Sequence, residues 1–386
     1  MLLNSLLMTG NEAAAYAVKQ SDVDLITAYP ITPQTTIVEK LAEYVGRGDV
    51  KAAMVLIESE HSALSACIGA SAAGARVFTA TSSQGLAYMH EVMYVASGLR
   101  LPIVMAVANR ALSAPINIHC DHSDIMGSRD SGWVQVFCED PQDVYDNVVK
   151  AFRLAEDPRV LLPVAVNFNG FTTSHSCEPV AVLPDEEVRR FLPRRERHRL
   201  SYDEPMTIGG FALPDAYFES KVEQEKALRA AGRVFTEVEE LYPNSESKRG
   251  AIHAEWTGGR VKLICMGDVA GSLRHFVKTQ RLQDIFDVLS VRLFRPFPRR
   301  RLIELLNDAE LVVVMDRSLS PGAVSPPLVS EVKSALYDAG FRVPVWSVVY
   351  GLGGKPVTLR KIGRLLGEAE RGVREREARS RRILLR

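Results

Sequence analysis

The sequence predicts an α/β protein made of two consecutive parallel-sheet domains, the second smaller than the first. One observation is that short, strongly apolar runs alternate with helical stretches between residues 11 and 168. Another is that this alternation starts again at Val261, after an interval that lacks it. Apolar strands alternating with helices are typical of a parallel sheet whose two faces are both covered.

The predicted elements of the first domain occur in regular order. The strand-like runs are LITA from Leu25, AMVLIE from Ala53, RVFTATS from Arg76, LPIVMAVA from Leu101 and LLPVAVNF from Leu161. Helical patterns cover residues 60–74, 86–98 and 142–155. We therefore expect a compact α/β core over about residues 1–178.

Residues 179–256 interrupt this order and read as an excursion and linker. They contain the charged run PRRERHRL, an expected amphipathic helix around residues 219–241 and the turn-rich PNSESKRG. Strand-like runs then return as VKLICMGD, FDVLSVRLF, ELVVVMD and PVWSVVYG. The predicted domains are residues 1–245 and 246–365, followed by a charged tail over residues 366–386 that forms a solvated helix or a frayed end.

Composition excludes several classes of protein. The 386 residues carry 47 basic and 47 acidic side chains, so no net charge attracts nucleic acid or an anionic membrane. No apolar run approaches the roughly 20 residues of a spanning helix, and MLLNSLLM at the start lacks a basic signal region. The five cysteines form no C-x-x-C pair, which argues against disulfides, zinc and iron-sulfur clusters. We expect a cytoplasmic protein without membrane insertion.

Four polar segments directly follow strands of the first domain. They are YPITPQTT, ESEHSALSACIGASAAGA, TSSQGL and NRALSAPINIHCDHSD. In open α/β sheets, ligands bind where the carboxyl ends of strands lead into loops. We therefore expect all four segments to face one cleft.

Each candidate in these segments also has a structural interpretation. Glu58 and Glu60 open a helix of small residues, where carboxylates are favoured by capping alone. Ser83 in TSSQGL lies in an ordinary strand-to-helix turn. Arg110 suits a carboxylate ligand, yet a structural ion pair explains it equally well.

Two further motifs resemble ligand sites only loosely. The string His119, Asp121, His122 and Asp124 is dense in metal-binding side chains but matches no standard zinc spacing, so we predict no metal site there. GLGGKP in the second domain lacks the spacing of a phosphate loop. A structural turn is the favoured interpretation of GLGGKP.

Taken together and in this order, several motifs resemble the alpha subunit of 2-oxoacid:ferredoxin oxidoreductases, closest to the pyruvate type. The motifs are YPITP, SEH, TSSQGL, NRALSAPINIHCDHSD and NFNGFTTSH, followed by MGDVAG, RPFP and YGLGG. The resemblance covers most of residues 10–358. It implies a pyrimidine-type domain that binds thiamine diphosphate, followed by a transketolase C-terminal-like α/β domain.

The resemblance also implies roles for individual residues. Glu60 matches the carboxyl that binds N1′ of the aminopyrimidine, whereas Glu58 matches a position that is not acidic in the family. Thr32 and Arg110 match residues that hold the 2-oxoacid. The remaining expected contacts are Pro30 and Ser83 to the cofactor and Asn117 to the substrate. The two prolines at 30 and 33 stiffen the turn that carries Thr32.

The chain lacks the other half of a thiamine diphosphate site. Such sites usually hold Mg²⁺ with a Gly-Asp-Gly motif and a later Asn, but Gly267-Asp268 continues with Val. A beta-type subunit with a diphosphate-binding domain is therefore expected to bring Mg²⁺. Iron-sulfur subunits are expected to hold [4Fe-4S] clusters, and the final acceptor is ferredoxin or an NAD-linked flavoprotein subunit.

The implied reaction is the oxidative decarboxylation of a 2-oxoacid with coenzyme A, giving an acyl-CoA and CO2. Pyruvate is the first choice of substrate, with 2-oxoisovalerate and an aryl 2-oxoacid such as phenylglyoxylate as further possibilities. Two alternatives belong to other classes. One is a subunit of a non-oxidative, transketolase-like enzyme, against which YPITP and DHSD argue. The other is a regulatory scaffold without catalysis, which the presence of Thr32, Glu60 and Arg110 disfavours.

Overall fold

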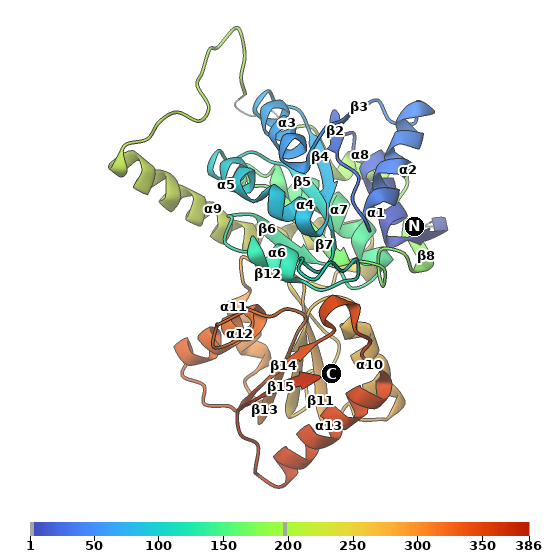
Figure 1. Ribbon diagram of the computed structural model, residues 1–386, viewed down its shortest axis with the longest axis vertical. Coiled ribbons are helices and arrows are strands. Elements are labelled where there is room, and N and C mark those ends of the chain that lie inside the picture. Colours follow the sequence, from blue (N-terminus) through green and yellow to red (C-terminus); the bar gives the residue numbers. More distant parts are fainter. Residues whose placement is uncertain (1–3, 196–198, 386) are drawn as a thin grey trace.

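The computed structural model describes residues 4–195 and 199–385, which form two α/β domains, one above the other in Figure 1. The first three residues of MLLNSLLM and residues 196–198 of PRRERHRL lie outside the described part of the chain. A seven-stranded sheet forms the centre of the first domain and a six-stranded sheet the centre of the second. The predicted α/β class with parallel sheets is confirmed.

The first sheet has the strand order β12-β6-β7-β5-β4-β2-β3. Its strands are β2 (Leu25–Ala28), β3 (Ala53–Leu56), β4 (Val77–Thr81), β5 (Val104–Asn109), β6 (Val134–Phe137), β7 (Val164–Asn169) and β12 (Leu293–Arg295). β2 to β7 run parallel, and β12 pairs antiparallel with β6. β4, β5 and β7 are buried along their whole length, which explains why their sequences are almost entirely apolar.

The expectation of complete burial is wrong for β3. This strand lies at the edge of the sheet, and its residues Val55 and Leu56 are 44% and 66% exposed. An apolar run can have the same composition in a central strand and in an edge strand whose side chains are exposed. Sequence alone therefore could not place β3 at an edge.

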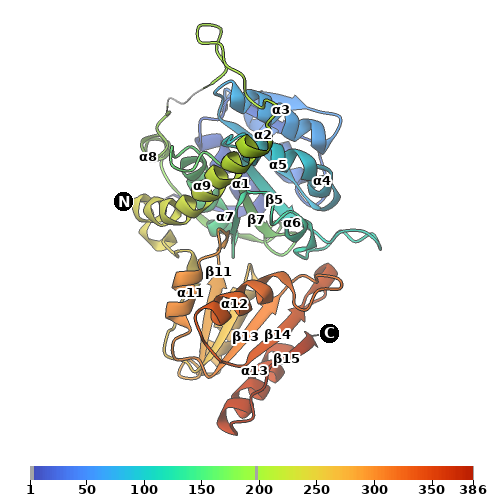
Figure 2. The same cartoon turned by 90° about the vertical axis from the view of Figure 1, so that its left-hand side faces the viewer.

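Helices cover the first sheet on both faces (Figures 1 and 2). They are α1 (Gly10–Gln20), α2 (Thr35–Gly46), α3 (Glu60–Ala72), α4 (Ser83–Tyr88), α5 (His90–Gly98), α6 (Ser123–Gly127) and α7 (Pro141–Ala155). α1, α2 and α7 share one apolar core, whereas α3 and α5 belong to the other. Helix starts follow the sequence: Asp140 caps α7, with Pro141 at its first position.

Residues 179–242 belong to the first domain more closely than a linker would, whereas the end of the predicted excursion forms β9 of the second sheet. β8 (Cys177–Val182) pairs with β1 (Asn4–Thr9), and α8 (Asp185–Phe191) follows. The predicted amphipathic helix is α9 (Pro214–Leu241), which begins five residues earlier than expected. One face of α9, including Ala231, Val234 and Phe235, is buried in the same core as α7. This burial fixes the helix to the domain.

The second sheet has the order β15-β14-β13-β10-β11-β9. Its strands are β9 (Ile252–Ala254), β10 (Val261–Cys265), β11 (Phe286–Val291), β13 (Leu311–Asp316), β14 (Val345–Tyr350) and β15 (Arg381–Leu385). The helices are α10 (Val269–Thr279), α11 (Arg299–Leu305), α12 (Pro327–Asp338) and α13 (Leu359–Arg374), and η1 (Ser245–Ser247) and η2 (Leu352–Gly354) are single 3-10 turns. All four predicted strands of this domain are present, as β10, β11, β13 and β14.

The expected domain boundary at residue 365 and the expected solvated tail over residues 366–386 are wrong, although the helix expected there as one alternative is present. α13 continues through the expected boundary at residue 365, and Leu366, Ala369 and Val373 are buried on its inner face. β15 then pairs in parallel with β14 and completes the sheet. Apolar residues three and four positions apart among many charges mark an amphipathic helix, so the high charge of this segment concealed its buried stripe.

Buried ion pairs join the two domains. Arg274 of α10 donates to Glu139, which follows β6, at 2.6 Å, and Arg292 pairs with Asp143 of α7. Burial opposes the charged form of Glu139, but hydrogen bonds from His253 and Arg274 hold its pKa well below the ordinary value. These contacts fix how the second domain sits under the first.

Candidate active site

The four polar segments meet at one edge of the first sheet. β3, β2, β4 and β5 are consecutive neighbours and run parallel, so their carboxyl ends lie side by side. The segments that follow them carry Glu60, Thr32, Ser83 and Arg110 respectively. The predicted convergence of these loops is what the sheet topology produces.

Glu60 is the first residue of α3, after the capping Ser59, and is 7% exposed. Its carboxylate lies against Gly85 of α4, where a Cβ atom would come within 2.5 Å of Glu60 Oε1. Among the described residues, no hydrogen bond or ion pair reaches this carboxylate. A largely buried carboxylate without a protein partner is costly unless a ligand supplies one.

Glu58 differs from Glu60 in every respect that matters for a site. It is exposed, and its Oε1 accepts a hydrogen bond from the Ser62 hydroxyl at 2.6 Å, which lowers its pKa. Glu58 therefore serves the start of α3. Glu60 is left as the carboxylate that faces the strand ends.

Arg110 follows β5 and is 7% exposed. Its guanidinium donates from Nη1 to the Thr32 carbonyl at 3.0 Å and from Nε to the Asn117 carbonyl at 2.9 Å. Burial lowers its pKa and Asp124 opposes that effect, but an arginine stays charged at neutral pH. In the described part of the chain, Nη2 has no partner. The side chain is thus held in place with Nη2 free, and its guanidinium forms no ion pair with any residue of 4–195 and 199–385.

The turn that carries Thr32 is fixed by backbone contacts. Asn11 Nδ2 donates to the Pro33 carbonyl at 2.7 Å, and Gln34 Nε2 donates to the Tyr29 carbonyl at 2.8 Å. Thr32 and Pro30 are exposed, and within residues 4–195 and 199–385 the Thr32 hydroxyl has no hydrogen-bond partner. The rigidity expected from the two prolines is therefore reinforced by the side chains of Asn11 in α1 and of Gln34, which directly precedes α2.

Asp124 connects the loops after β4 and β5, a role that the sequence did not reveal. Its carboxylate accepts hydrogen bonds from the backbone amides of Ser83 at 3.1 Å and Arg110 at 3.0 Å, and from Asn109 Nδ2 at 3.0 Å. Complete burial raises its pKa to about 7. The available signal was a carboxylate in the first turn of the helix that ends the loop after β5. Because Asp124 stands in a string of metal-binding residue types, we considered it in the sequence only as a metal ligand.

The side chains of two predicted contact residues, Ser83 and Asn117, form hydrogen bonds with other groups of this chain. The Ser83 hydroxyl donates to the Ala111 carbonyl at 2.6 Å, and Ser83 has a positive φ of 48°. Asn117 Nδ2 donates to the Gly353 carbonyl at 3.0 Å, and its Oδ1 accepts from the His119 amide at 2.7 Å. Their side chains organise the site, and their predicted contacts with cofactor and substrate stay predictions.

The metal-like string separates into unrelated contacts. Asp121 Oδ2 accepts from the Gly353 amide at 3.1 Å, and His122 Nε2 bonds Asn169 Oδ1 at 2.8 Å. Burial lowers the pKa of His122 to about 4. No group of three or more His, Cys, Asp or Glu side chains is arranged to hold a metal ion within the described ranges.

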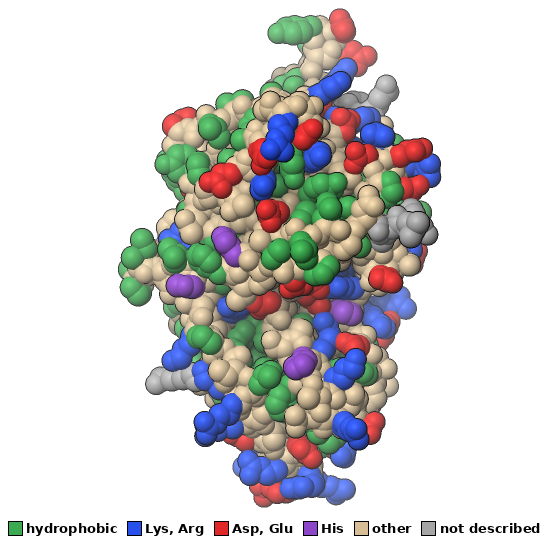
Figure 3. Space-filling view, turned by 90° about the vertical axis from the view of Figure 1, so that its right-hand side faces the viewer, with side chains coloured by type: hydrophobic (Ala, Val, Ile, Leu, Met, Phe, Trp, Pro, Cys, Tyr) green, Lys and Arg blue, Asp and Glu red, His purple; other side chains and the backbone are tan. Residues whose placement is uncertain are grey.

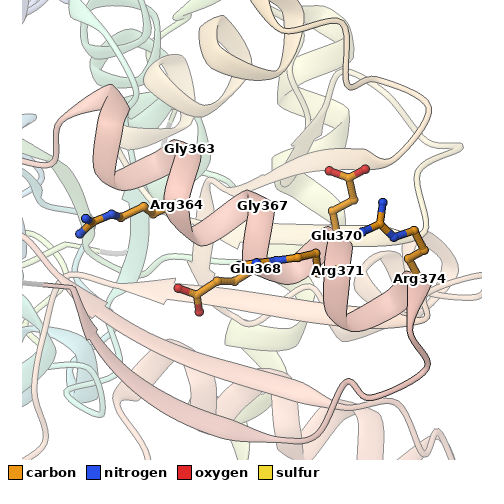
Figure 4. Close-up of a pocket in the computed structure, with 7 residues that line it drawn as sticks. All are labelled: Gly363, Arg364, Gly367, Glu368, Glu370, Arg371 and Arg374. Carbon is orange, nitrogen blue, oxygen red and sulfur yellow. The ribbon is translucent and has the colours of Figure 1, made fainter.

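In the second domain, charged groups that follow two of the strands pair with each other. Asp268, which follows β10, pairs with Arg317, which follows β13, at 3.1 Å. A groove of about 600 Å³ runs along α13 between Gly363 and Arg374 (Figure 4), on the side of the second domain remote from the first. Figure 3 shows Lys and Arg side chains gathered at that end. The candidate site therefore rests on the strand ends of the first domain.

Comparison with known proteins agrees with this placement. Residues 16–240 match the family model described as pyruvate flavodoxin/ferredoxin oxidoreductase, thiamine diphosphate-binding, and residues 259–362 match pyruvate:ferredoxin oxidoreductase core domain II. The chain belongs to this family. The resemblance inferred from the sequence motifs is thereby confirmed, and the first domain is of the thiamine diphosphate-binding type.

Relatives match almost the whole chain. Pyruvate synthase subunit PorA of Methanocaldococcus jannaschii is 44% identical, with 95% of each chain covered. PorA of Thermotoga maritima is 45% identical over 95% of this chain and 98% of its own. Ketoisovalerate oxidoreductase subunit VorA of Pyrococcus abyssi is 40% identical, covering 92% of this chain and 91% of its own.

A solved structure shares the fold. It is the 2-oxoglutarate:ferredoxin oxidoreductase from Magnetococcus marinus, with a TM-score of 0.72 and 19% identity. The match covers 95% of this chain and 65% of that one, so this chain spans less than two thirds of its length. In the described residues, every helix is too short or too polar to cross a bilayer.

Proposed function

We propose that this chain is the alpha subunit of a heteromeric oxidoreductase that decarboxylates a 2-oxoacid with thiamine diphosphate and transfers the acyl group to coenzyme A. The observation that carries the proposal is a pair of free groups at one edge of the first sheet: the unpartnered, largely buried carboxylate of Glu60, and the guanidinium of Arg110, which is held by two hydrogen bonds and keeps Nη2 free. One group fits a protonated ring nitrogen and the other fits a carboxylate. Oxidoreductase subunits among the relatives support the same reaction class.

Thiamine diphosphate supplies a carbon nucleophile for the keto carbon and accepts the electron pair released with CO2. Glu60 would hold the proton at N1′ of its aminopyrimidine, and Gly85 leaves the room that this contact needs. Arg110 would donate from Nη2 to the substrate carboxylate, with the Thr32 hydroxyl beside it. Because that carboxylate leaves as CO2, Arg110 must orient it without binding it too strongly.

Exposed apolar side chains around the site support a partner subunit that covers it. Leu56 of β3, Tyr88 of α4 and Ile116 in the loop after β5 are 66%, 58% and 80% exposed. Apolar groups beside a site are typical of an interface. A beta-type subunit docked there would bring the diphosphate half of the site with Mg²⁺, and iron-sulfur subunits would carry electrons to ferredoxin or a flavoprotein. A cytoplasmic location stays a prediction.

Pyruvate is the proposed substrate, because the PorA relatives at 37–45% identity carry the name pyruvate synthase. The VorA relative at 40% identity makes 2-oxoisovalerate the second candidate. The test is to assay the purified complex with coenzyme A against pyruvate, 2-oxoisovalerate and phenylglyoxylate. The proposal expects the highest kcat/KM for pyruvate. A higher value for either larger acid would replace it as substrate, and no coenzyme A-dependent turnover with any of them would overturn the reaction class.

A further inference from the structure

The loop from Arg110 to Asp124, which we call the grip loop, contacts both domains. Its two ends are tied together in the first domain, because Asp124 Oδ2 accepts a hydrogen bond from the Arg110 amide at 3.0 Å. The part of the loop from Asn117 to His122 contacts the second domain. There the His122 amide donates to the Arg317 carbonyl at 3.0 Å.

The GLGG turn after β14 makes most of the hydrogen bonds by which the second domain holds the grip loop. The Gly354 amide donates to the Cys120 carbonyl at 2.7 Å, and the Gly353 amide donates to Asp121 Oδ2 at 3.1 Å. In the opposite direction, Asn117 Nδ2 donates to the Gly353 carbonyl at 3.0 Å. The turn thus both donates to the loop and accepts from it, across 236 residues of sequence in the case of Asn117.

These contacts need glycine for two reasons. Gly351, Gly353 and Gly354 have φ values of 62°, 56° and 78°, a region that other residues rarely adopt. A Cβ atom at Gly353 would come within 2.4 Å of Asn117 Nδ2, and one at Gly354 within 2.4 Å of His119 Cβ. The backbone of the turn therefore approaches the grip loop as closely as a side chain would.

Asn117 connects this turn to the guanidinium. Its side chain bonds the second domain, and its own carbonyl accepts from Arg110 Nε at 2.9 Å. We propose that the GLGG turn of the second domain, acting through Asn117, is the positioning element that sets the guanidinium of Arg110 for the substrate carboxylate. This inference rests on the proposed function of Arg110, and it gives the second domain a part in substrate binding that requires no direct contact with the substrate.

The test uses the purified complex with all its subunits and compares Gly353→Ala, Asn117→Ala and the control Gly340→Ala. Gly340, after α12, has a φ of 75° and nothing within 4 Å of its Cβ position, so it matches the backbone strain of Gly353 without the contact. Gly353→Ala and Asn117→Ala are expected to raise the KM for the 2-oxoacid about tenfold, because a small misplacement of a binding group is costly. The KM for coenzyme A stays unchanged, and Gly340→Ala changes neither value.

Each other result is decisive. A KM for the 2-oxoacid that Gly353→Ala leaves at the level of Gly340→Ala overturns the inference, even if Asn117→Ala raises it, because Asn117 would then touch the substrate directly. If Gly353→Ala prevents assembly, an unchanged KM in Asn117→Ala overturns the inference alone. Arg110→Gln separates the two proposals. An unchanged KM for the 2-oxoacid in Arg110→Gln overturns the proposed function of Arg110. A raised KM in Arg110→Gln, with an unchanged KM in Gly353→Ala and Asn117→Ala, overturns only the positioning role.

Discussion

The carboxyl edges of the two parallel sheets meet at the domain junction, yet their polar groups are used in opposite ways. At the edge of the first sheet, Glu60 has no described protein partner and Arg110 keeps a free donor edge. At the edge of the second, Asp268 and Arg317 pair with each other, and the glycine turn bonds the grip loop. The same architecture thus leaves polar groups free in the first domain and, in the second, bonds them to each other or to the grip loop.

The largest effect that tests this contrast is expected at Glu60. Glu60→Gln removes the carboxyl proposed to hold the N1′ proton and should lower kcat at least about 100-fold. The measurement is steady-state turnover of the assembled complex, with thermal unfolding as a check of the fold. Asp268→Asn is the matched carboxylate at the edge of the second sheet and is expected to change kcat less than about twofold. An equal loss of kcat in Glu60→Gln and Asp268→Asn would contradict the proposed difference between the two sheet edges.

A smaller effect is expected at Thr32, whose hydroxyl lies free on the fixed turn. Thr32→Val keeps the size of the side chain and removes the hydrogen bond, which should lower kcat/KM about tenfold. Cofactor affinity and the unfolding temperature are expected to stay at wild-type values. Unchanged kinetics would reduce the YPITP turn to a purely structural element.

The junction itself is expected to respond to pH through His122. Burial lowers its folded pKa from 6.5 to about 4, so its stabilisation is present above pH 6.5 and is lost as the pH falls through 4. The full loss corresponds to about 3 kcal/mol in the free energy of unfolding. Asp124, whose pKa is raised from 3.8 to about 7, changes stability in the opposite direction throughout this range.

A difference measurement isolates the histidine. Denaturant unfolding of the wild-type chain and of His122→Asn is compared at pH values from 4 to 7.5. The gap between the two curves is expected to narrow as the pH falls below 6.5. A constant gap would show that His122 does not titrate in this range and that the junction does not exclude its charged form.

The sequence was sufficient for the α/β order and for the meeting of the four loops. Parallel strands alternating with helices place all carboxyl ends on one edge, so YPITP, SEH, TSSQ and NRALS had to converge. The motifs around Glu60 and Arg110 also identified the family, which the comparisons confirm.

What the sequence did not reveal depends on contacts between distant residues. The side chain of Asn117 finds its partner 236 positions away, and α9 becomes part of the first core only through packing on α7. β15 joins its sheet beside β14 although it is short, begins with two arginines and is exposed at three of its five residues. Local composition carries no information about such partners.

We propose that this chain holds only half of an active site, the half containing Glu60 and Arg110. The most direct test is to measure CO2 release from pyruvate by the purified chain alone, supplied with thiamine diphosphate, Mg²⁺ and coenzyme A, beside the assembled complex. We predict turnover by the complex and none by the chain alone. Turnover by the isolated chain would contradict the claim.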